Sequence, residues 1–98
     1  MTSKNIEMLE YILRGKNRIQ VYDALSMHFR GLMPREIKSY CKISSYSTIT
    51  RILKGLLLKG VIQCTDAYNT RGKLYYLTEE AHELKEDILD YVESNFLS

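Results

Sequence analysis

The sequence predicts a mainly α-helical protein with one small β-hairpin, which places it in the α+β class. Three observations support this fold class. Apolar residues recur at helical spacing along most of the 98 residues. Two short stretches, "VIQCT" and "KLYYLT", alternate as strands do, and the segment between them is rich in turn-forming residues. Because the chain is long enough to bury one core, we expect residues 1–98 to form a single domain.

Two helices are predicted in the first third of the chain. The first covers about residues 4–14, with its apolar residues on one side. The second follows Gly15 and ends near residue 28; Asn17 can cap it, and Gln20 stands three positions later as in a capping box. Ile6, Leu9 and Leu13, with Met8 and Ile12 beside them, share one side of the first helix, although "YILRG" could also be extended. The apolar face of the second helix comprises Ile19, Tyr22, Leu25 and Phe29.

The middle of the sequence predicts two helices joined by a tight turn. Pro34 suits the first position of the earlier helix, because the missing N–H of proline would be unpaired there anyway. Ser44 or Ser45 can cap the second helix, and Gly60 ends it. Two short helices with a hydrophobic residue in the turn outline a helix-turn-helix. The inward face of the second helix is expected to comprise Ile49, Ile52, Leu53, Leu56 and Leu57.

A β-hairpin and a last helix follow. The strands are predicted at 61–65 and 73–78, and the basic tip between them carries Arg71 and Lys73. Thr78 can cap the last helix, which we expect to continue for about four turns. Its apolar stripe comprises Ala81, Leu84, Ile88, Tyr91 and Val92.

The order of these elements is that of a winged helix-turn-helix domain with an additional long C-terminal helix. The winged-helix core would cover about residues 16–77, flanked by terminal helices at about 4–14 and 78–97. We expect the terminal helices to form a homodimer interface, because the last apolar stripe is longer than a small core can cover. The alternative is that this helix packs only on its own core. The expected interface residues are Ile6, Leu9, Leu13, Leu84, Ile88, Tyr91 and Val92.

Charge is distributed unevenly along the chain. Residues 1–77 carry 13 lysines and arginines against five acids, a net charge of +8. Residues 78–98 carry one lysine against seven acids, a net charge of −6. This division indicates a surface for nucleic acid on the body and an acidic element that stays away from phosphates. The alternative is an ordinary solvated charge distribution.

The predicted second helix of the helix-turn-helix has short hydroxyl side chains in its first turns. At 100° per residue, Ile49 and Leu53 lie on the buried side, which places Arg51 roughly opposite. A helix in a major groove contacts base edges mainly with its first turns, and arginine can bind guanine or phosphate. The alternative is a solvated polar face. The expected DNA-binding residues are Ser45, Tyr46, Ser47, Thr48, Thr50, Arg51 and Lys54 in the helix, and Arg71 and Lys73 in a wing that lies on the backbone or in a minor groove.

Three segments also resemble a known group of proteins. "YILRGKNRIQVYDAL", "ISSYSTITRILKGLLLKGVIQC" and "TRGKLYYLT", within about residues 10–80, are similar to small archaeal winged helix-turn-helix regulators related to the MarR and ArsR groups. The resemblance implies a DNA-binding regulator that pairs with a second copy. The chain departs from the pattern at Met33, where a serine or threonine cap is usual, and at Gly55, which costs about 1 kcal/mol against alanine inside a helix.

The sequence offers no arrangement typical of an enzyme or a metal site. Clustered Ser/His/Asp, Cys/His or paired-carboxylate groups are not present, so we expect no enzyme activity and no cofactor. Cys41 and Cys64 lack zinc-site spacing; both are expected to be buried, and a disulfide is the less favoured alternative. With no apolar run long enough for a membrane span and no signal-peptide pattern, a cytoplasmic protein is expected.

Together these observations predict a function. The chain would be a sequence-specific, double-stranded DNA-binding transcription regulator that acts as a homodimer, with the polar helix in the major groove. The alternative is a winged-helix adaptor that binds another protein and reads no DNA sequence, since one fold serves many functions. A polar rather than apolar helix face favours the first hypothesis. The sequence indicates no particular small-molecule effector.

Overall fold

The computed structural model describes residues 3–66 and 72–97. Its elements are the helices α1 (Ser3–Leu13), α2 (Lys16–Ser26), α3 (Pro34–Cys41) and α4 (Tyr46–Leu58), the strands β1 (Ile62–Asp66) and β2 (Lys73–Leu77), the helices α5 (Glu79–His82) and α6 (Lys85–Val92), and the π-helical η1 (Glu93–Leu97).

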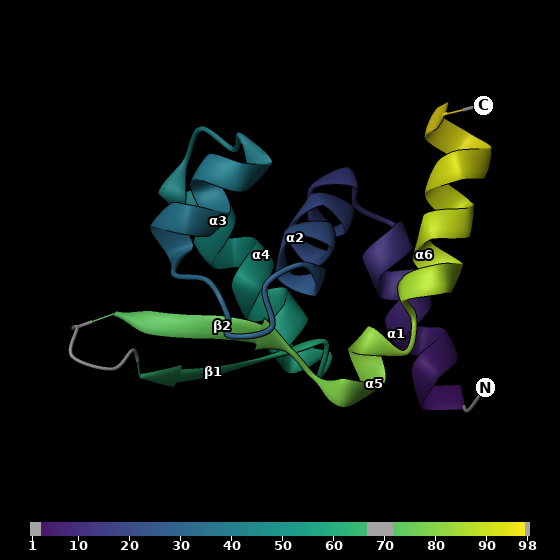
Figure 1. Cartoon of the computed structure of the whole chain (residues 1–98), viewed down its shortest axis with the longest axis horizontal. Coiled ribbons are helices and arrows are strands. Elements are labelled where there is room, and N and C mark those ends of the chain that lie inside the picture. Colours follow the sequence, from purple (N-terminus) through teal and green to yellow (C-terminus); the bar gives the residue numbers. More distant parts are fainter. Residues whose placement is uncertain (1–2, 67–71, 98) are drawn as a thin grey trace.

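The helices surround one core, and the hairpin extends from it. In Figure 1 the hairpin points outward at one end of the molecule, while α1 and α6 lie at the other end with both termini. Helices α3 and α4, the helix-turn-helix, lie above the hairpin in this view, and α2 lies between them and α1. The predicted fold class, mainly helical with one antiparallel hairpin, is therefore confirmed.

The hairpin is anchored to the body by a third extended segment. Strands β1 and β2 pair antiparallel, with Ile62 opposite Leu77 and Cys64 opposite Tyr75. Leu32 then pairs with Tyr75 through two backbone hydrogen bonds of 2.9 Å. Gly31 permits this approach, because a Cβ there would lie 2.9 Å from the Tyr75 carbonyl oxygen and its φ is +92°. The base of the hairpin is thus fixed against the segment that leads into α3.

Every helix from α1 to α6, and both strands, contribute to the core. Its buried side chains include much of the inward face that the sequence predicts for α4. Phe29 is an exception: it is 78% exposed, so the prediction that it faces inward is wrong. The reason is that α2 ends at Ser26, before the helical spacing reaches Phe29. The largest fully buried side chains are Met8, Ile12, Tyr22, Leu25, Ile37, Ile49, Leu56, Ile62 and Leu84.

The start of α2 also differs from the prediction. The helix begins at Lys16 with Gly15 in the capping position, so Asn17 is a helical residue rather than the cap. Among the residues that the structure describes, no side chain forms a capping hydrogen bond there. The predicted role of Pro34 is confirmed, since it opens α3. Met33 precedes it without a hydroxyl, but the Glu36 carboxylate accepts a hydrogen bond of 2.9 Å from the Met33 N–H and secures this start.

The predicted long C-terminal helix is interrupted. Thr78 caps α5 as expected, with its hydroxyl oxygen accepting a hydrogen bond from the Ala81 N–H. The chain then turns before α6, because the Ala81 carbonyl oxygen accepts from the Leu84 N–H, at 3.1 Å, and from the Tyr22 hydroxyl. In a continuous α-helix that carbonyl would bind the N–H four residues later. Tyr22, which α2 supplies, therefore helps to hold the turn that separates α5 from α6.

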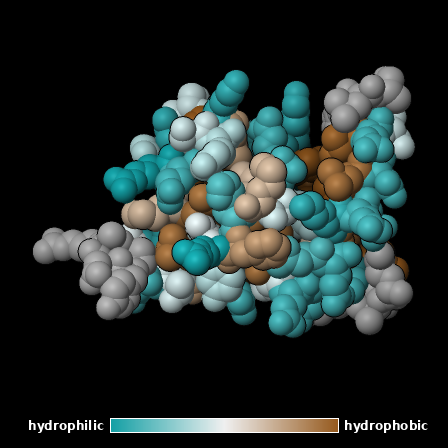
Figure 2. Space-filling view, in the orientation of Figure 1, coloured by the Kyte–Doolittle hydropathy of each residue, from teal (hydrophilic) through white to brown (hydrophobic). Residues whose placement is uncertain are grey.

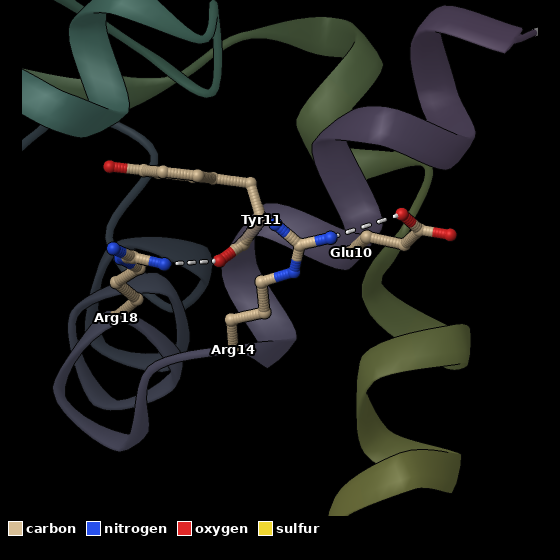
Figure 3. Close-up of polar contacts among 4 residues, drawn as sticks. All are labelled: Glu10, Tyr11, Arg14 and Arg18. Carbon is tan, nitrogen blue, oxygen red and sulfur yellow. Dashed lines mark hydrogen bonds and ion pairs between the residues drawn. The ribbon is translucent and has the colours of Figure 1, made fainter.

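Gly55 lies in the middle of α4 for a reason that only the structure reveals. A Cβ added at Gly55 would clash with the Tyr11 hydroxyl oxygen, so Tyr11 of α1 occupies the space of a side chain. Figure 3 shows the Tyr11 side chain extending from α1 with Arg18 beside it. The Arg18 guanidinium lies 3.9 Å from the centre of the Tyr11 ring and donates a hydrogen bond of 2.9 Å to the Tyr11 carbonyl oxygen. The glycine thus lets α1 pack closely on α4.

Replacing Gly55 with alanine is expected to destabilise the protein by about 1–3 kcal/mol, because the new methyl group meets a ring that Arg18 holds in place. In a Tyr11→Phe background the nearest remaining ring atom is 3.3 Å from the added Cβ, a tight contact that a small ring shift relieves, so the same change should cost clearly less. Urea unfolding of the four proteins in this double-mutant cycle measures the difference. Equal effects of Gly55→Ala in the two backgrounds would contradict the packing argument.

Candidate nucleic-acid interface

The start of α4 presents a polar surface. Tyr46, Ser47, Thr50, Arg51 and Lys54 are exposed, whereas Ser45 and Thr48 are half-buried. The opposite side of the helix is buried through Ile49, Leu53 and Leu56. The structure therefore brings the predicted recognition residues of α4 together on its outward surface, with the leucines anchoring it to the core. We call this surface, formed by Ser45, Tyr46, Ser47, Thr48, Thr50, Arg51 and Lys54, the recognition surface.

The hydroxyl groups at the start of α4 bind each other rather than the backbone. Ser45 occupies the capping position that the sequence predicts, but its Oγ lies 2.7 Å from the Ser47 Oγ, and its side chain makes no capping hydrogen bond. The Tyr46 ring forms a cation–π contact with Lys38, whose Nζ lies 5.1 Å from the ring centre. Both serine hydroxyls and the tyrosine thus lie at the surface on a helix whose other side is firmly packed.

The wing supplies one described basic residue of the two predicted there. Lys73 is exposed and forms an ion pair with Asp66 across the hairpin, at 3.2 Å. A hydrogen bond with Asp66 is the main reason why the pKa of Lys73 is raised, so this amine stays charged. Arg71 lies outside the described residues. An anion approaching the wing must compete with Asp66 for Lys73.

A cleft beside the recognition surface was not predicted from the sequence. It has a volume of about 430 Å³ and lies where the start of α2 meets the turn between α3 and α4. No local pattern could have found it, because its walls come from segments more than twenty residues apart. Its polar lining residues are Lys16, Asn17, Gln20, Lys42, Ser44 and Thr48.

The terminal helices pack against each other within one chain. Leu84 and Ile88 are only 1% and 3% exposed, so their predicted place in a dimer interface is wrong: they belong to the core of this chain. Ile6, in contrast, is 44% exposed, and Leu89, which was not predicted, is 41% exposed. The remaining predicted interface residues, Leu9, Leu13, Tyr91 and Val92, are partly buried against the core.

An apolar hollow of about 220 Å³ lies between α2 and α6. Ile19, Ile88, Leu89 and Val92 provide its apolar walls, with Gln20 and Asp23 at its polar side. In Figure 2 hydrophobic residues gather in a hollow next to α6. Exposed apolar surface on α6 is thus real but narrower than the sequence suggests, because part of the stripe is already buried.

The two cysteines differ in environment. Cys41 is buried as predicted, and burial, followed by the nearby charge of Asp23, raises its pKa from 9.0 to about 11. The prediction that Cys64 is buried is wrong: it shares a strand face with buried Ile62, but β1 is exposed from its second residue onward, because the hairpin extends beyond the core there. Both thiols are free, so the alternative of a disulfide between them does not apply to this structure.

This difference predicts two reaction rates with a disulfide reagent at pH 8. Cys64 should react at the rate of an exposed thiol, whereas Cys41 should react orders of magnitude more slowly, because thiolate is the attacking species and Cys41 holds its proton. The Cys41 thiol loses its proton near pH 9 in the unfolded chain but near pH 11 in the folded chain. The free energy of unfolding should therefore fall as the pH rises from 9.0 to about 11. Each single variant, Cys41→Ala or Cys64→Ala, leaves one cysteine, so its reaction kinetics assign the fast and slow phases. A fast phase in Cys64→Ala, where only Cys41 remains, would contradict the assignment.

Within the described residues, no group of three or more histidine, cysteine, aspartate or glutamate side chains is placed to hold a metal ion. Among the same residues, no helix is both long and apolar enough to span a bilayer.

The arrangement of elements matches solved structures. A MepR–DNA complex from S. aureus superposes with a TM-score of 0.73 at 24% identity, covering 92% of this chain and 76% of that chain. MarR from E. coli, a mutant complexed with operator DNA, gives 0.72 at 21% identity, covering 94% and 67%. The MarR regulator from Oenococcus oeni gives 0.69 at 23% identity, covering 93% and 71%. The chain has the winged-helix fold.

At the level of sequence, no protein-family model matches the chain, and no curated protein matches it either. The identities to the solved MarR-type structures are below 25%, so the shared property is the fold. The archaeal origin implied by the resemblance stays a prediction.

Proposed function

We propose that this protein is a sequence-specific, double-stranded DNA-binding transcription regulator that acts as a homodimer. The observation that carries the proposal is the recognition surface, where hydroxyl groups, Arg51 and Lys54 project from a helix whose other side is packed into the core. Short donors and acceptors on the first turns of an exposed helix are suited to base edges in a major groove.

In this proposal α4 enters the major groove and the wing lies on the adjacent backbone or in the minor groove. Arg51 contacts a base edge or a phosphate, and Lys73 exchanges its pairing with Asp66 for a phosphate oxygen. The net charge of +8 on residues 1–77 favours this approach, whereas the acidic segment after Leu77 stays away from the DNA. The S. aureus and E. coli neighbours, which were solved as DNA complexes, support the proposal by sharing the fold.

We propose that the dimer forms through the remaining apolar surface of the terminal helices. Ile6 and Leu89 are the exposed apolar residues of α1 and α6, and the hollow between α2 and α6 adds further apolar surface. A second copy would cover this surface, which water otherwise contacts. On this view the chain works as one domain in the cytoplasm, without a cofactor and without catalysing a reaction.

The second candidate function, a protein–protein adaptor, is supported by exposed apolar side chains. Leu58 at the end of α4 is 87% exposed, and Met27 and Tyr40 are 61% and 57% exposed. Exposed apolar residues of this kind are common in protein interfaces. They lie outside the recognition surface, however, whose polar character favours DNA.

The test is selection of bound fragments from a random pool of duplex DNA, followed by titration of the recovered sequence at several salt concentrations. A regulator should recover a palindromic site, and its affinity should fall by powers of ten between about 50 and 200 mM salt if six or more phosphates are neutralised. If no sequence is enriched and the affinity responds little to salt, the adaptor becomes the better account.

A further inference from the structure

The cleft beside the recognition surface joins the start of α2 to a second segment that runs from the end of α3 into α4. Lys16 and Asn17 come from the first turn of α2, Lys42 and Ser44 from the turn between α3 and α4, and Thr48 from the first turns of α4. Buried Ile43 and Cys41 form its apolar floor. Because Thr48 also belongs to the recognition surface, anything held in the cleft lies next to the start of α4.

The cleft carries positive charge from lysines that form no ion pair with a described residue. Lys16 and Lys42 are exposed, and neither forms an ion pair with any residue that the structure describes. This distinguishes them from Lys73, which Asp66 neutralises, and from Arg14, which pairs with Glu10. No acidic residue of the described chain lines the cleft; Asp23 lines the neighbouring one, which Lys42 also lines.

The position of Lys42 is fixed by the backbone. Lys42 ends α3 in the left-handed conformation, with φ of 54°, and its N–H binds the Lys38 carbonyl oxygen. Residues other than glycine rarely adopt this conformation, and a local hydrogen bond or turn must hold them in it. The strained cap thus sets where the Lys42 side chain leaves the turn.

The cleft and the wing lie at different ends of α4. The cleft includes residues at the start of the helix, whereas the hairpin follows its other end through Gly60. In Figure 1 the hairpin extends below α3 and α4, whereas α2 lies beside α4. A helix in a major groove has a phosphate backbone on each side, and contacts to both backbones fix its orientation.

We propose that this cleft binds a phosphate of the DNA backbone, on the side of the recognition helix away from the wing. The phosphate oxygens are bound by the ammonium groups of Lys16 and Lys42, with Asn17, Ser44 and Thr48 as hydrogen-bond donors. The site would fix how the first turn of α4 enters the groove. This inference rests on the proposed DNA-binding function and adds a second anchor to it.

The experiment compares wild type with a Lys16→Ala, Lys42→Gly double variant on the selected duplex and on a scrambled one. Alanine is compatible with the start of α2, and glycine suits the positive φ of Lys42, so the fold should persist. Lys85→Ala is the matched control, because Lys85 is an exposed lysine at the first position of α6. Circular dichroism and thermal unfolding verify that all three proteins are folded.

In a plot of log affinity against log salt concentration, the slope of the double variant should be lower by about one per protomer, on both duplexes alike. At 0.1 M salt this corresponds to an affinity loss of about tenfold per protomer. Lys85→Ala should bind as wild type does. In a scan of methylphosphonate substitutions, one backbone position should weaken wild type but leave the double variant unaffected. That position should lie outside the base pairs at which Arg51→Ala relaxes the sequence preference.

Two other results have distinct meanings. If wild type binds with a steep salt response and the double variant has the same slope and the same methylphosphonate profile, the cleft proposal is overturned and the proposed function stands. If wild type itself shows no salt-dependent binding to any duplex, the proposed function fails and the cleft proposal fails with it.

Discussion

Replacing Arg51 with alanine should cost about 1–3 kcal/mol of binding free energy per protomer on the preferred duplex, and about twice that in a dimer complex. The reason is the position of Arg51 on the exposed side of α4, opposite the buried Ile49 and Leu53. If its guanidinium contacts a base edge, the loss falls mainly on the preferred sequence. The variant should therefore discriminate less between that sequence and a scrambled one.

The wing should behave differently. Lys73→Ala should weaken all duplexes nearly alike and reduce the salt slope by about one, because a phosphate contact carries no sequence information. Its ion pair with Asp66 adds a second expectation: Asp66→Asn frees Lys73 and should tighten binding to every duplex by a similar factor.

Fluorescence titration of the variants on preferred and scrambled duplexes, at several salt concentrations, separates these effects. If Arg51→Ala binds both duplexes as wild type does, α4 does not read DNA, and the adaptor hypothesis becomes the better account. If Asp66→Asn leaves affinity unchanged, Lys73 does not approach the phosphates.

The largest effect on stability is expected from Ile88→Asp. Ile88 is 3% exposed within one chain, so the new carboxylate would be buried without a partner, at a cost of about 4 kcal/mol or more. The protein should therefore unfold or lose most of its stability. This result differs from the one expected for an interface residue, which would convert a folded dimer into a folded monomer.

Leu89→Asp is the matched variant, one position along the same helix. Leu89 is 41% exposed, so a carboxylate can remain in water when the chain is alone, and the fold should persist. If the proposed dimer uses this surface, sedimentation of Leu89→Asp should shift from dimer to folded monomer. A folded, monomeric Ile88→Asp would contradict the core assignment, and a wild type that sediments as a monomer at tens of micromolar would overturn the dimer proposal.

The sequence could predict elements whose signals are local. Pro34, Gly60 and Thr78 stand at the ends of helices, and the conformations that they favour are the ones found there. The polar surface of α4 was equally predictable, because a single period of 3.6 residues determines which side chains share a face. The recognition residues of α4 were therefore placed on one exposed surface before any tertiary contact was known.

Features that depend on contacts between distant segments could not be predicted. The break between α5 and α6 is stabilised by the Tyr22 hydroxyl, which donates to Ala81 from a helix far away in sequence. Leu84 and Ile88 share one apolar stripe with partly exposed residues, and the stripe alone does not show which of them its own core covers. Cys64 shares a strand face with buried Ile62, as the alternation predicts, but the hairpin has already left the core at its position.

The sequence by itself determined the order of elements up to the end of the hairpin, the outward side of α4 and the uneven charge, since these follow from periodicity, turn-forming residues and composition. Only the tertiary structure decided that Gly55 makes room for Tyr11 and that Lys73 is paired with Asp66. It also brought Lys16 and Lys42 to one cleft. The physical reason is that periodicity specifies the direction of a side chain relative to its own helix or strand, whereas a partner in space depends on how separate elements pack.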